Sequence, residues 1–164
     1  MIIALVVVVF IVERSGFVDK YIYLLSHKRA LEGDFTESKD IGIFPTFNDA
    51  ENTKNDYKKL VGFCDYPNGF IIDKIKVDYC EITDLSLSTC NDEELFYMVY
   101  HVYENIEEDY EVVTFIGCFS TQQNAECVVQ ILKDKNIFDN GDFGIYDAKF
   151  GRLGWSEGFV VGEK

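Results

Sequence analysis

Apolar stretches separated by polar runs recur along the chain at a constant spacing. Residues 21–28 and 96–103 are both largely apolar, and each contains a histidine near its end. An acidic connection follows in both places, and a second apolar stretch that reads Ile-Gly-x-Phe comes next, at residues 41–44 and 116–119. Runs of this length bounded by polar residues are typical of β-strands. Two β-hairpins are therefore predicted.

A helix is predicted after each hairpin. Thr46 with Asp49, and Ser120 with Gln123, have the spacing of a capping box, which satisfies N–H groups at the start of a helix. Apolar residues of the second helix fall at i, i+3, i+4 and i+7, on one face of the helix: Ala125, Val128, Val129 and Leu132. This face is expected to cover a sheet.

A third strand is predicted after each helix, at residues 69–78 and 142–151. The corresponding elements lie 73 to 75 residues apart, and self-similarity at a fixed spacing indicates a duplicated unit. The sequence therefore predicts an α+β protein of two tandem β-β-α-β units, each an antiparallel sheet with one helix. The units span residues 19–84 and 95–164, and an acidic connector, residues 85–94, joins them.

The first 18 residues are predicted to form a buried strand that packs on the core and joins the two units. The chain opens with twelve apolar residues, short of the ~20 that a membrane-spanning helix needs. Many of them are β-branched, which favours a strand buried on both faces. Residues 14–18 (RSGFV) also resemble residues 156–160 (SEGFV). Either the N-terminal segment supplies the first unit with a missing terminal element, or the similarity is due to chance.

The charge of the chain indicates which classes of partner it can bind. Twenty-nine acidic and fifteen basic side chains give a net charge of −14. Phosphate backbones and anionic membranes attract basic surfaces, so direct binding to nucleic acid or to a membrane is not expected. Residues 95–164 contain twelve acidic side chains and only five basic ones. A basic protein is the partner that this distribution favours.

The acidic connection of the second unit is the main candidate binding surface. Repulsion between neighbouring carboxylates costs stability, and acidic residues around an aromatic side chain suit a basic protein partner. The candidate binding residues are Glu104, Glu107, Glu108, Asp109, Tyr110 and Glu111, together with Asp92, Glu93 and Glu94 of the connector. The alternative is a solvated hairpin loop, which such charge runs usually form.

No catalytic residue, metal site or cofactor is predicted. His27 and His101 occupy equivalent positions, but no nucleophile or comparable catalytic motif accompanies either of them. Each is expected to be a strand-end imidazole bonded to a neighbouring loop. The five cysteines include no C-x-x-C pair, which indicates a reduced protein; Cys118 and Cys127 are expected to be small apolar core residues. Trp155 is expected in the core, or alternatively as an anchor for a partner.

The order of these motifs resembles a small bacterial domain family of unknown function, present as two tandem copies. In the second unit the pattern comprises His101, Ile116, Gly117, Phe119, Ala125, Phe138, Phe143 and residues 155–159. In the first unit it comprises His27, Ile41, Gly42, Phe44, Ala50, Gly62 and Phe63, and the final motif is missing. The resemblance covers about three quarters of the chain and implies a fold without assigning a chemistry.

In its overall profile the chain is similar to immunity proteins of bacterial toxin–immunity pairs, including those of contact-dependent growth inhibition. This resemblance implies a cytoplasmic, non-enzymatic protein that binds a basic toxin domain, such as a nuclease, and occludes its active site. Two alternatives stay open: a small-molecule-binding or regulatory module with a pocket between the units, and an enzyme built around His27 or His101.

Overall fold

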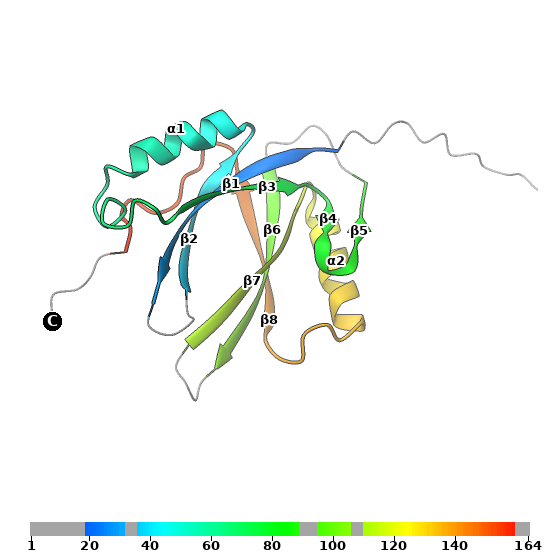
Figure 1. Ribbon diagram of the computed structural model, residues 1–164. Helices are drawn as coiled ribbons and strands as arrows, with labels where there is room; N and C mark the ends of the chain where they lie inside the picture. The colour runs from blue at the N-terminus through cyan, green and yellow to red at the C-terminus, as the bar shows by residue number, and fades with distance from the viewer. Residues whose placement is uncertain (1–18, 32–35, 89–94, 106–109, 160–164) are drawn as a thin grey trace, which may run out of the picture.

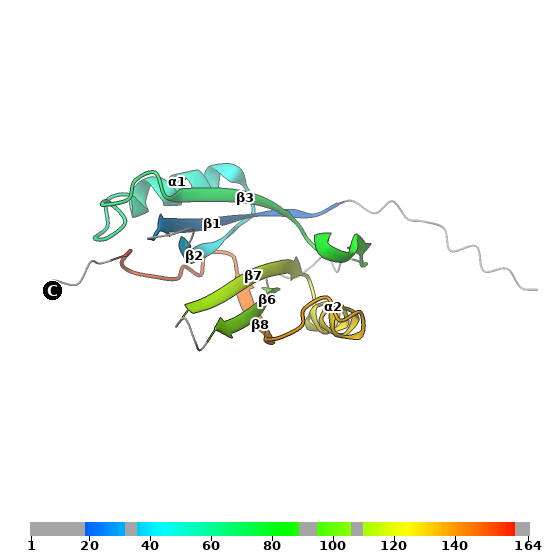
Figure 2. The same ribbon diagram turned by 60° about the horizontal axis from the view of Figure 1, so that its bottom comes forward.

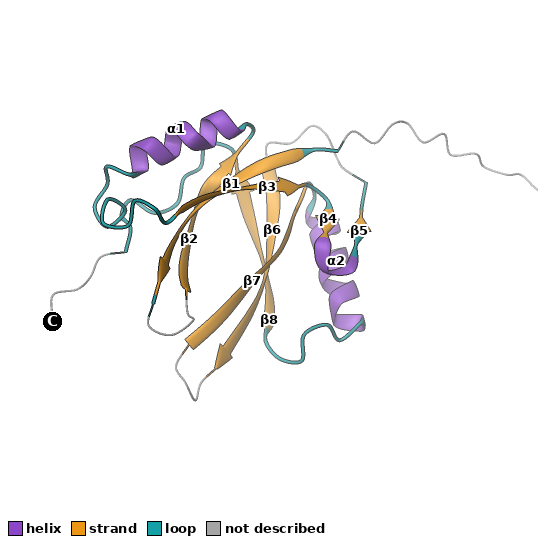
Figure 3. Ribbon diagram, viewed as in Figure 1, coloured by secondary structure: helices purple, strands orange, loops and turns teal. Residues whose placement is uncertain are grey.

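A computed structural model describes residues 19–31, 36–88, 95–105 and 110–159. Its elements follow the chain in the order β1 (Tyr21–Ala30), β2 (Thr36–Phe44), α1 (Phe47–Tyr57), β3 (Phe70–Lys76), β4 (Tyr79–Cys80), the 3₁₀ helix η1 (Glu81–Thr83), β5 (Leu85–Ser86), β6 (Leu95–Asn105), β7 (Tyr110–Phe119), α2 (Gln122–Asp134) and β8 (Asp142–Lys149). The described chain therefore has a mixed α and β fold with mostly antiparallel sheets and two α-helices (Figures 1 and 3), in agreement with the predicted class.

Two three-stranded antiparallel sheets form the centre of the molecule. The first sheet has the strand order β2-β1-β3, and the second has the order β7-β6-β8. The register of the β1–β2 hairpin shifts between Leu25 and Ser26, and that of the β6–β7 hairpin shifts between Val99 and Tyr100. In each sheet the strand that comes first in the chain is thus central, and a bulge interrupts its hairpin.

The two sheets pack face to face, and each helix covers an outer face. The inner faces share one apolar core, formed by Ile22, Leu24, Ile43, Val77, Phe96, Met98 and Cys118. On the outer face of the first sheet, Leu25 and Ile41 pack with Ala50 and Tyr57 of α1. The outer face of the second sheet packs against Ala125, Val128 and Leu132 of α2, as the helical periodicity predicts. Figure 2 shows α1 and α2 on opposite sides of the paired sheets.

Threonine side chains begin both helices. The Thr46 hydroxyl oxygen accepts a hydrogen bond from the backbone N–H of Asp49, as the sequence predicts. In α2 the N-cap is Thr121, which accepts from the backbone N–H of Asn124. The predicted cap Ser120 lies one residue too early, because the last extended residue before the helix is Thr121, with φ −136° and ψ 150°. The two helix starts therefore use the same cap chemistry.

The chain crosses from one sheet to the other after each third strand. After β3, Val77 forms a parallel bridge with Cys118 of β7, and the Asp78 N–H donates to the Cys118 carbonyl. Cys80 packs in the core between the second sheet and α2, although the predicted boundary assigned it to the first unit. Residues 79–87 therefore contact the second half of the molecule.

The segment after β8 makes the opposite crossing. The Gly154 N–H donates to the Ile41 carbonyl at 2.7 Å, and the Gly158 N–H donates to the Val61 carbonyl at 2.8 Å. Phe159 is 3% exposed, and its ring lies 5.4 Å from that of His27. In Figure 1 this orange-to-red segment runs beside the first sheet and α1. Residues 154–159 thus complete the first half of the molecule.

Several sequence predictions concern the ends of the chain and its connections. The predicted N-terminal strand, including residues 14–18, lies outside the described residues, and the two sheets contact each other directly through their inner faces. Of the predicted connector, residues 85–88 are described, and they include β5. Within the described residues, no helix is both long and apolar enough to cross a membrane.

Candidate functional site

Three of the nine candidate binding residues lie in the described part of the chain. Glu104 and Glu111 are both exposed and stand directly opposite each other in the β6–β7 register. Tyr110 is partly buried, and its hydroxyl oxygen accepts a hydrogen bond from the Asn105 side chain at 3.1 Å. The other six candidates lie outside the described residues: Asp92, Glu93, Glu94, Glu107, Glu108 and Asp109.

The pair of glutamates is electrostatically uncompensated within the described structure. The ion pairs found there involve Arg29, Lys54, Lys59, Lys76 and Arg152, and none of them includes Glu104 or Glu111. Like charges directly opposite each other on neighbouring strands destabilise a sheet. The pairing of β6 with β7 therefore gives no reason for placing two negative charges opposite each other.

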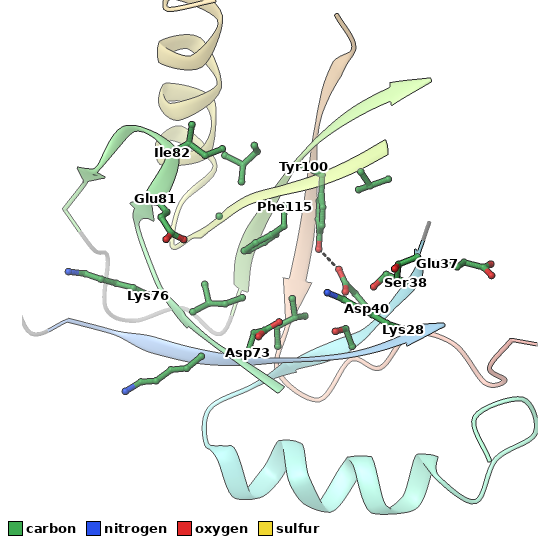
Figure 4. A pocket seen from close by; sticks show the side chains of 18 of the residues that line it. Lys28, Glu37, Ser38, Asp40, Asp73, Lys76, Glu81, Ile82, Tyr100 and Phe115 are labelled. Atoms are coloured by element: carbon green, nitrogen blue, oxygen red, sulfur yellow. Dashed lines mark hydrogen bonds between the residues drawn. The ribbon is translucent and has the colours of Figure 1, made fainter. Parts of the chain in front are cut away.

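A groove of about 1450 Å³ lies between the two sheets, beside this hairpin. Its walls come from β1, β2 and β3 on one side and from β6 and β7 on the other, and Tyr110 and Glu111 are among its lining residues. Figure 4 shows acidic and basic side chains around it, with the ring of Phe115 pointing into it. Of the candidate residues, Tyr110 and Glu111 thus adjoin the groove. A pocket between the two units was expected only for the alternative function, a small-molecule-binding or regulatory module.

A hydrogen bond crosses the groove and connects the two sheets. The Tyr100 hydroxyl of β6 donates to the Asp40 carboxylate of β2 at 2.6 Å (Figure 4). Burial of Tyr100 and the neighbouring Asp40 charge raise the pKa of the tyrosine well above its usual range. Both effects favour the neutral hydroxyl, which is the form that donates this bond.

Replacing Tyr100 with phenylalanine is expected to make the free energy of unfolding fall less steeply as the pH rises above 10. In the native protein the unfolded chain loses the tyrosine proton near pH 10, while the folded chain retains it. The free energy of unfolding therefore falls as pH rises above 10, by up to about 1.4 kcal/mol per pH unit from this group. Urea denaturation at several pH values between 9 and 12 measures this slope. An unchanged slope in the variant would contradict the assignment.

A second, smaller pocket of about 510 Å³ lies where the C-terminal segment crosses the first sheet. Lys39 Nζ lies 3.8 Å from the centroid of the Trp155 ring, and the Arg29 guanidinium lies 4.8 Å from that of Phe159. Arg29 also forms an ion pair with Glu37 at 2.6 Å. The pocket therefore combines two cations with two aromatic rings.

Trp155 is not a core residue, and that prediction is wrong. Its side chain is 52% exposed, and its φ of 60° is in the left-handed region that non-glycine residues rarely adopt. The turn that follows the Gly154–Ile41 hydrogen bond presents the ring at the surface. An exposed tryptophan in an uncommon backbone conformation fits the alternative role, an anchor for a partner or ligand.

Both histidines are bonded to loops, as predicted, and both are buried, but they lie within β1 and β6 rather than at the ends of these strands. His27 Nε2 donates to the Tyr66 carbonyl, and His101 Nε2 donates to the Asn140 carbonyl, each at 2.8 Å. The His101 ring also stacks on Phe138, with centroids 4.0 Å apart. These contacts account for the Nε2 atom of each imidazole, whereas His27 Nδ1 is buried without a hydrogen-bond partner in the described structure.

The two cysteines expected in the core differ. Cys118 is buried, and burial together with the Asp78 charge raises the pKa of its thiol far above the usual value. Cys127 lies on α2 but is exposed, so the prediction of a core residue is wrong there. Among the described residues, no three histidine, cysteine, aspartate or glutamate side chains are grouped to hold a metal ion.

Comparisons with known proteins do not assign the site. The chain matches no protein-family model, and neither curated proteins nor solved structures yielded a match. The site residues that the sequence did not reveal are Arg29, Lys39, Asp40 and Tyr100. They come together only when the two halves of the molecule pack, and no local motif marks them.

Proposed function

We propose that this protein is a non-catalytic immunity protein that binds a basic bacterial toxin domain in the cytoplasm and covers its active site. The observation that carries the proposal is the uncompensated pair of Glu104 and Glu111 beside the groove between the sheets. A cationic partner surface would relieve the repulsion between them. The net charge of −14 would attract such a partner from a distance.

Binding would proceed in two physical steps. The acidic surface steers the basic partner into contact, which raises the association rate and makes it sensitive to salt. Aromatic and apolar side chains at the groove, including Tyr110, Val113 and Phe115, then slow dissociation. Carboxylates held against the toxin would take the place of the phosphates of a nucleic-acid substrate.

Replacing Glu104 with lysine is expected to raise the stability of the protein and to lower its affinity for the partner. The new lysine faces Glu111 across the strands, so the hairpin is expected to gain about 0.2–1 kcal/mol of stability. Affinity for the toxin domain is expected to fall about tenfold or more, and its salt dependence is expected to weaken. A basic nuclease toxin domain is the partner to test, by calorimetry at several salt concentrations.

Asp139→Lys is the matched control. This exposed residue lies in the loop after α2, and the substitution changes the net charge by the same amount. Its affinity is expected to stay within about threefold of the native value, since screening weakens distant charges. An equal loss of affinity in both variants would show that the net charge of the protein, and not the proposed surface, determines binding. Absence of any complex with the native protein would overturn the proposed function.

A second candidate function is binding of a small molecule at the pocket beside Trp155. Its volume of about 510 Å³ lies in the range of about 300–1000 Å³ that small-molecule sites occupy, and residues from both halves of the chain line it. Its lining contains Arg29 and Lys39 but also Glu37 and Glu157, so charge alone does not select the sign of the ligand. Since Trp155 is the single tryptophan, a change in intrinsic fluorescence on addition of a ligand would report binding directly.

We further propose that the two halves are copies of one β-β-α-β unit. The supporting observations are pairs of equivalent contacts: the caps Thr46 and Thr121, and the loop-bonded His27 and His101. Both histidine bonds also span 39 residues of chain. On this proposal, the crossings after β3 and β8 are reciprocal exchanges between the two copies.

A further inference from the structure

One edge of the second sheet is open along part of β7. This strand pairs with β6 on one side. On its other side, contacts to Val77 and Asp78 occur at Cys118, near the end of the strand. No described strand pairs there with residues 111–115, and the groove between the sheets runs along this stretch. The main-chain N–H and C=O groups on this edge therefore lack a neighbouring strand in the described structure.

The residues on this edge do not protect it from pairing. β7 reads YEVVTFIGCF and contains neither lysine nor proline, and its one charged residue, Glu111, and its bulge at Ile116 flank residues 112–115. Val112 and Val113 are 43% and 54% exposed. β-Branched and aromatic residues also have the highest preference for strands. The composition thus favours addition of another strand.

The first sheet offers an internal comparison, because β2 occupies the equivalent position. Gly42 faces Leu25 before the register shift in one hairpin, and Gly117 faces Val99 in the other. Counting back from the two glycines aligns Glu37, Ser38, Lys39 and Asp40 of β2 with Val112, Val113, Thr114 and Phe115 of β7. The β2 edge is charged, and the Gly154 N–H bonds to its Ile41 carbonyl. The same edge is therefore protected in one sheet and open in the other.

The opposite wall of the groove includes a second strand edge. Four consecutive residues of β3, Asp73 to Lys76, line the groove, although successive side chains of a strand point to opposite faces. This pattern means that the edge of β3 itself adjoins the groove. Val77 and Cys118 form a parallel bridge where the two strands meet. The groove of about 1450 Å³ also exceeds the usual volume of a small-molecule site. The space between the edges of β3 and β7 therefore suits an extended chain.

We propose that residues 111–115 of β7 bind an extended, basic segment of the partner protein as an added β-strand. This inference rests on the proposed function and adds the binding mode. Glu111, Val113 and Phe115 alternate along the groove face, so the segment would carry lysine or arginine opposite Glu111 and apolar residues opposite the other two. A second copy of this chain would bring another pair of glutamates to the edge, which makes it a poorer occupant.

The test uses a seven-residue peptide of alternating lysine and valine and measures amide hydrogen exchange of the full chain by NMR. Exchange is expected to slow at residues 111–115 when the peptide binds. A peptide with methyl groups on alternate backbone nitrogens is expected to bind at least tenfold more weakly, because it cannot complete the strand pairing. Val113→Ser is expected to weaken binding about tenfold. Val61→Ser, at an exposed valine outside the groove, is expected to leave it unchanged.

The possible outcomes separate this inference from the proposed function. Equal binding of the methylated peptide, or protection elsewhere in the chain, would overturn strand addition and leave electrostatic binding of a basic toxin intact. Equal binding of an alternating glutamate and valine peptide would overturn the basic occupant, and with it the proposed function. Protection of β7 by self-association without peptide would identify a second copy as the occupant. No binding of the peptide at millimolar concentration would overturn the inference.

Discussion

Replacement of Phe159 with alanine is expected to lower the free energy of unfolding by about 3–5 kcal/mol, the usual cost of truncating a buried phenylalanine. The ring is 3% exposed and lies against His27, Tyr66 and the Arg29 guanidinium. Although Phe159 follows the second sheet in the chain, all of these contacts belong to the first half. Amide protection in β1 and β2 is therefore expected to fall further than protection in β6. Urea denaturation and hydrogen exchange measure the two effects.

Ser156→Ala in the same segment is the control, and it is expected to change stability by less than about 0.5 kcal/mol because the residue is exposed. A small effect of Phe159→Ala, or a loss of protection confined to β6 and β7, would contradict the assignment of residues 154–159 to the first half of the molecule.

Gly141→Ala is expected to destabilise the protein by about 3 kcal/mol or more, because two costs combine. Its φ of +98° is a conformation that side chains disfavour. A β-carbon there would also collide with the Val102 carbonyl oxygen and approach His101 Nε2 to 2.7 Å. Since the Asn140 carbonyl holds that same imidazole, the loop would lose its attachment to β6. Thermal denaturation gives the change in stability.

Two further glycine variants separate these costs. Gly151 has a φ of +76° with no atom within 4 Å of an added β-carbon, so Gly151→Ala should cost only about 1–2 kcal/mol. At Gly69, an added β-carbon would meet the Lys28 carbonyl and His27 Nε2, without a positive φ. Gly69→Ala therefore measures the collision alone. Equal effects at Gly141 and Gly151 would show that the collision is relieved at no cost.

The local elements of this fold could be predicted from the sequence, because local physics determines them. Apolar runs around His27 and His101 became the central strands, and the spacing of Ala125, Val128 and Leu132 matched the buried face of α2. The cap at Ser120 was wrong by one residue, since Ser120 and Thr121 have the same hydroxyl chemistry. In the structure the Ser120 N–H bonds to the distant Asp78, and the Thr121 hydroxyl caps the helix.

The candidate site could be predicted only in part, because its geometry depends on contacts between distant segments. The charge run located Glu104 and Glu111, but the groove beside them forms only when the two sheets pack. Tryptophan is a residue type that is often buried. Trp155 is nevertheless exposed, because the chain turns after the Gly154 N–H bonds to the Ile41 carbonyl. Cys127 lies on a helix with an apolar face but on its exposed side. The helical spacing of α2 does place Cys127 away from the apolar face, whereas the exposure of Trp155 carries no signal in the neighbouring sequence.

The late crossing of the chain affects how the protein is synthesised. The ribosome makes β1, β2, α1 and β3 first, yet His27 of that half packs against Phe159, which is translated only after the whole second sheet. The first sheet therefore cannot reach its final stability until the second sheet has also been synthesised. Premature termination before Gly154 would leave this sheet incomplete, and such truncated chains would be suitable substrates for cellular proteases.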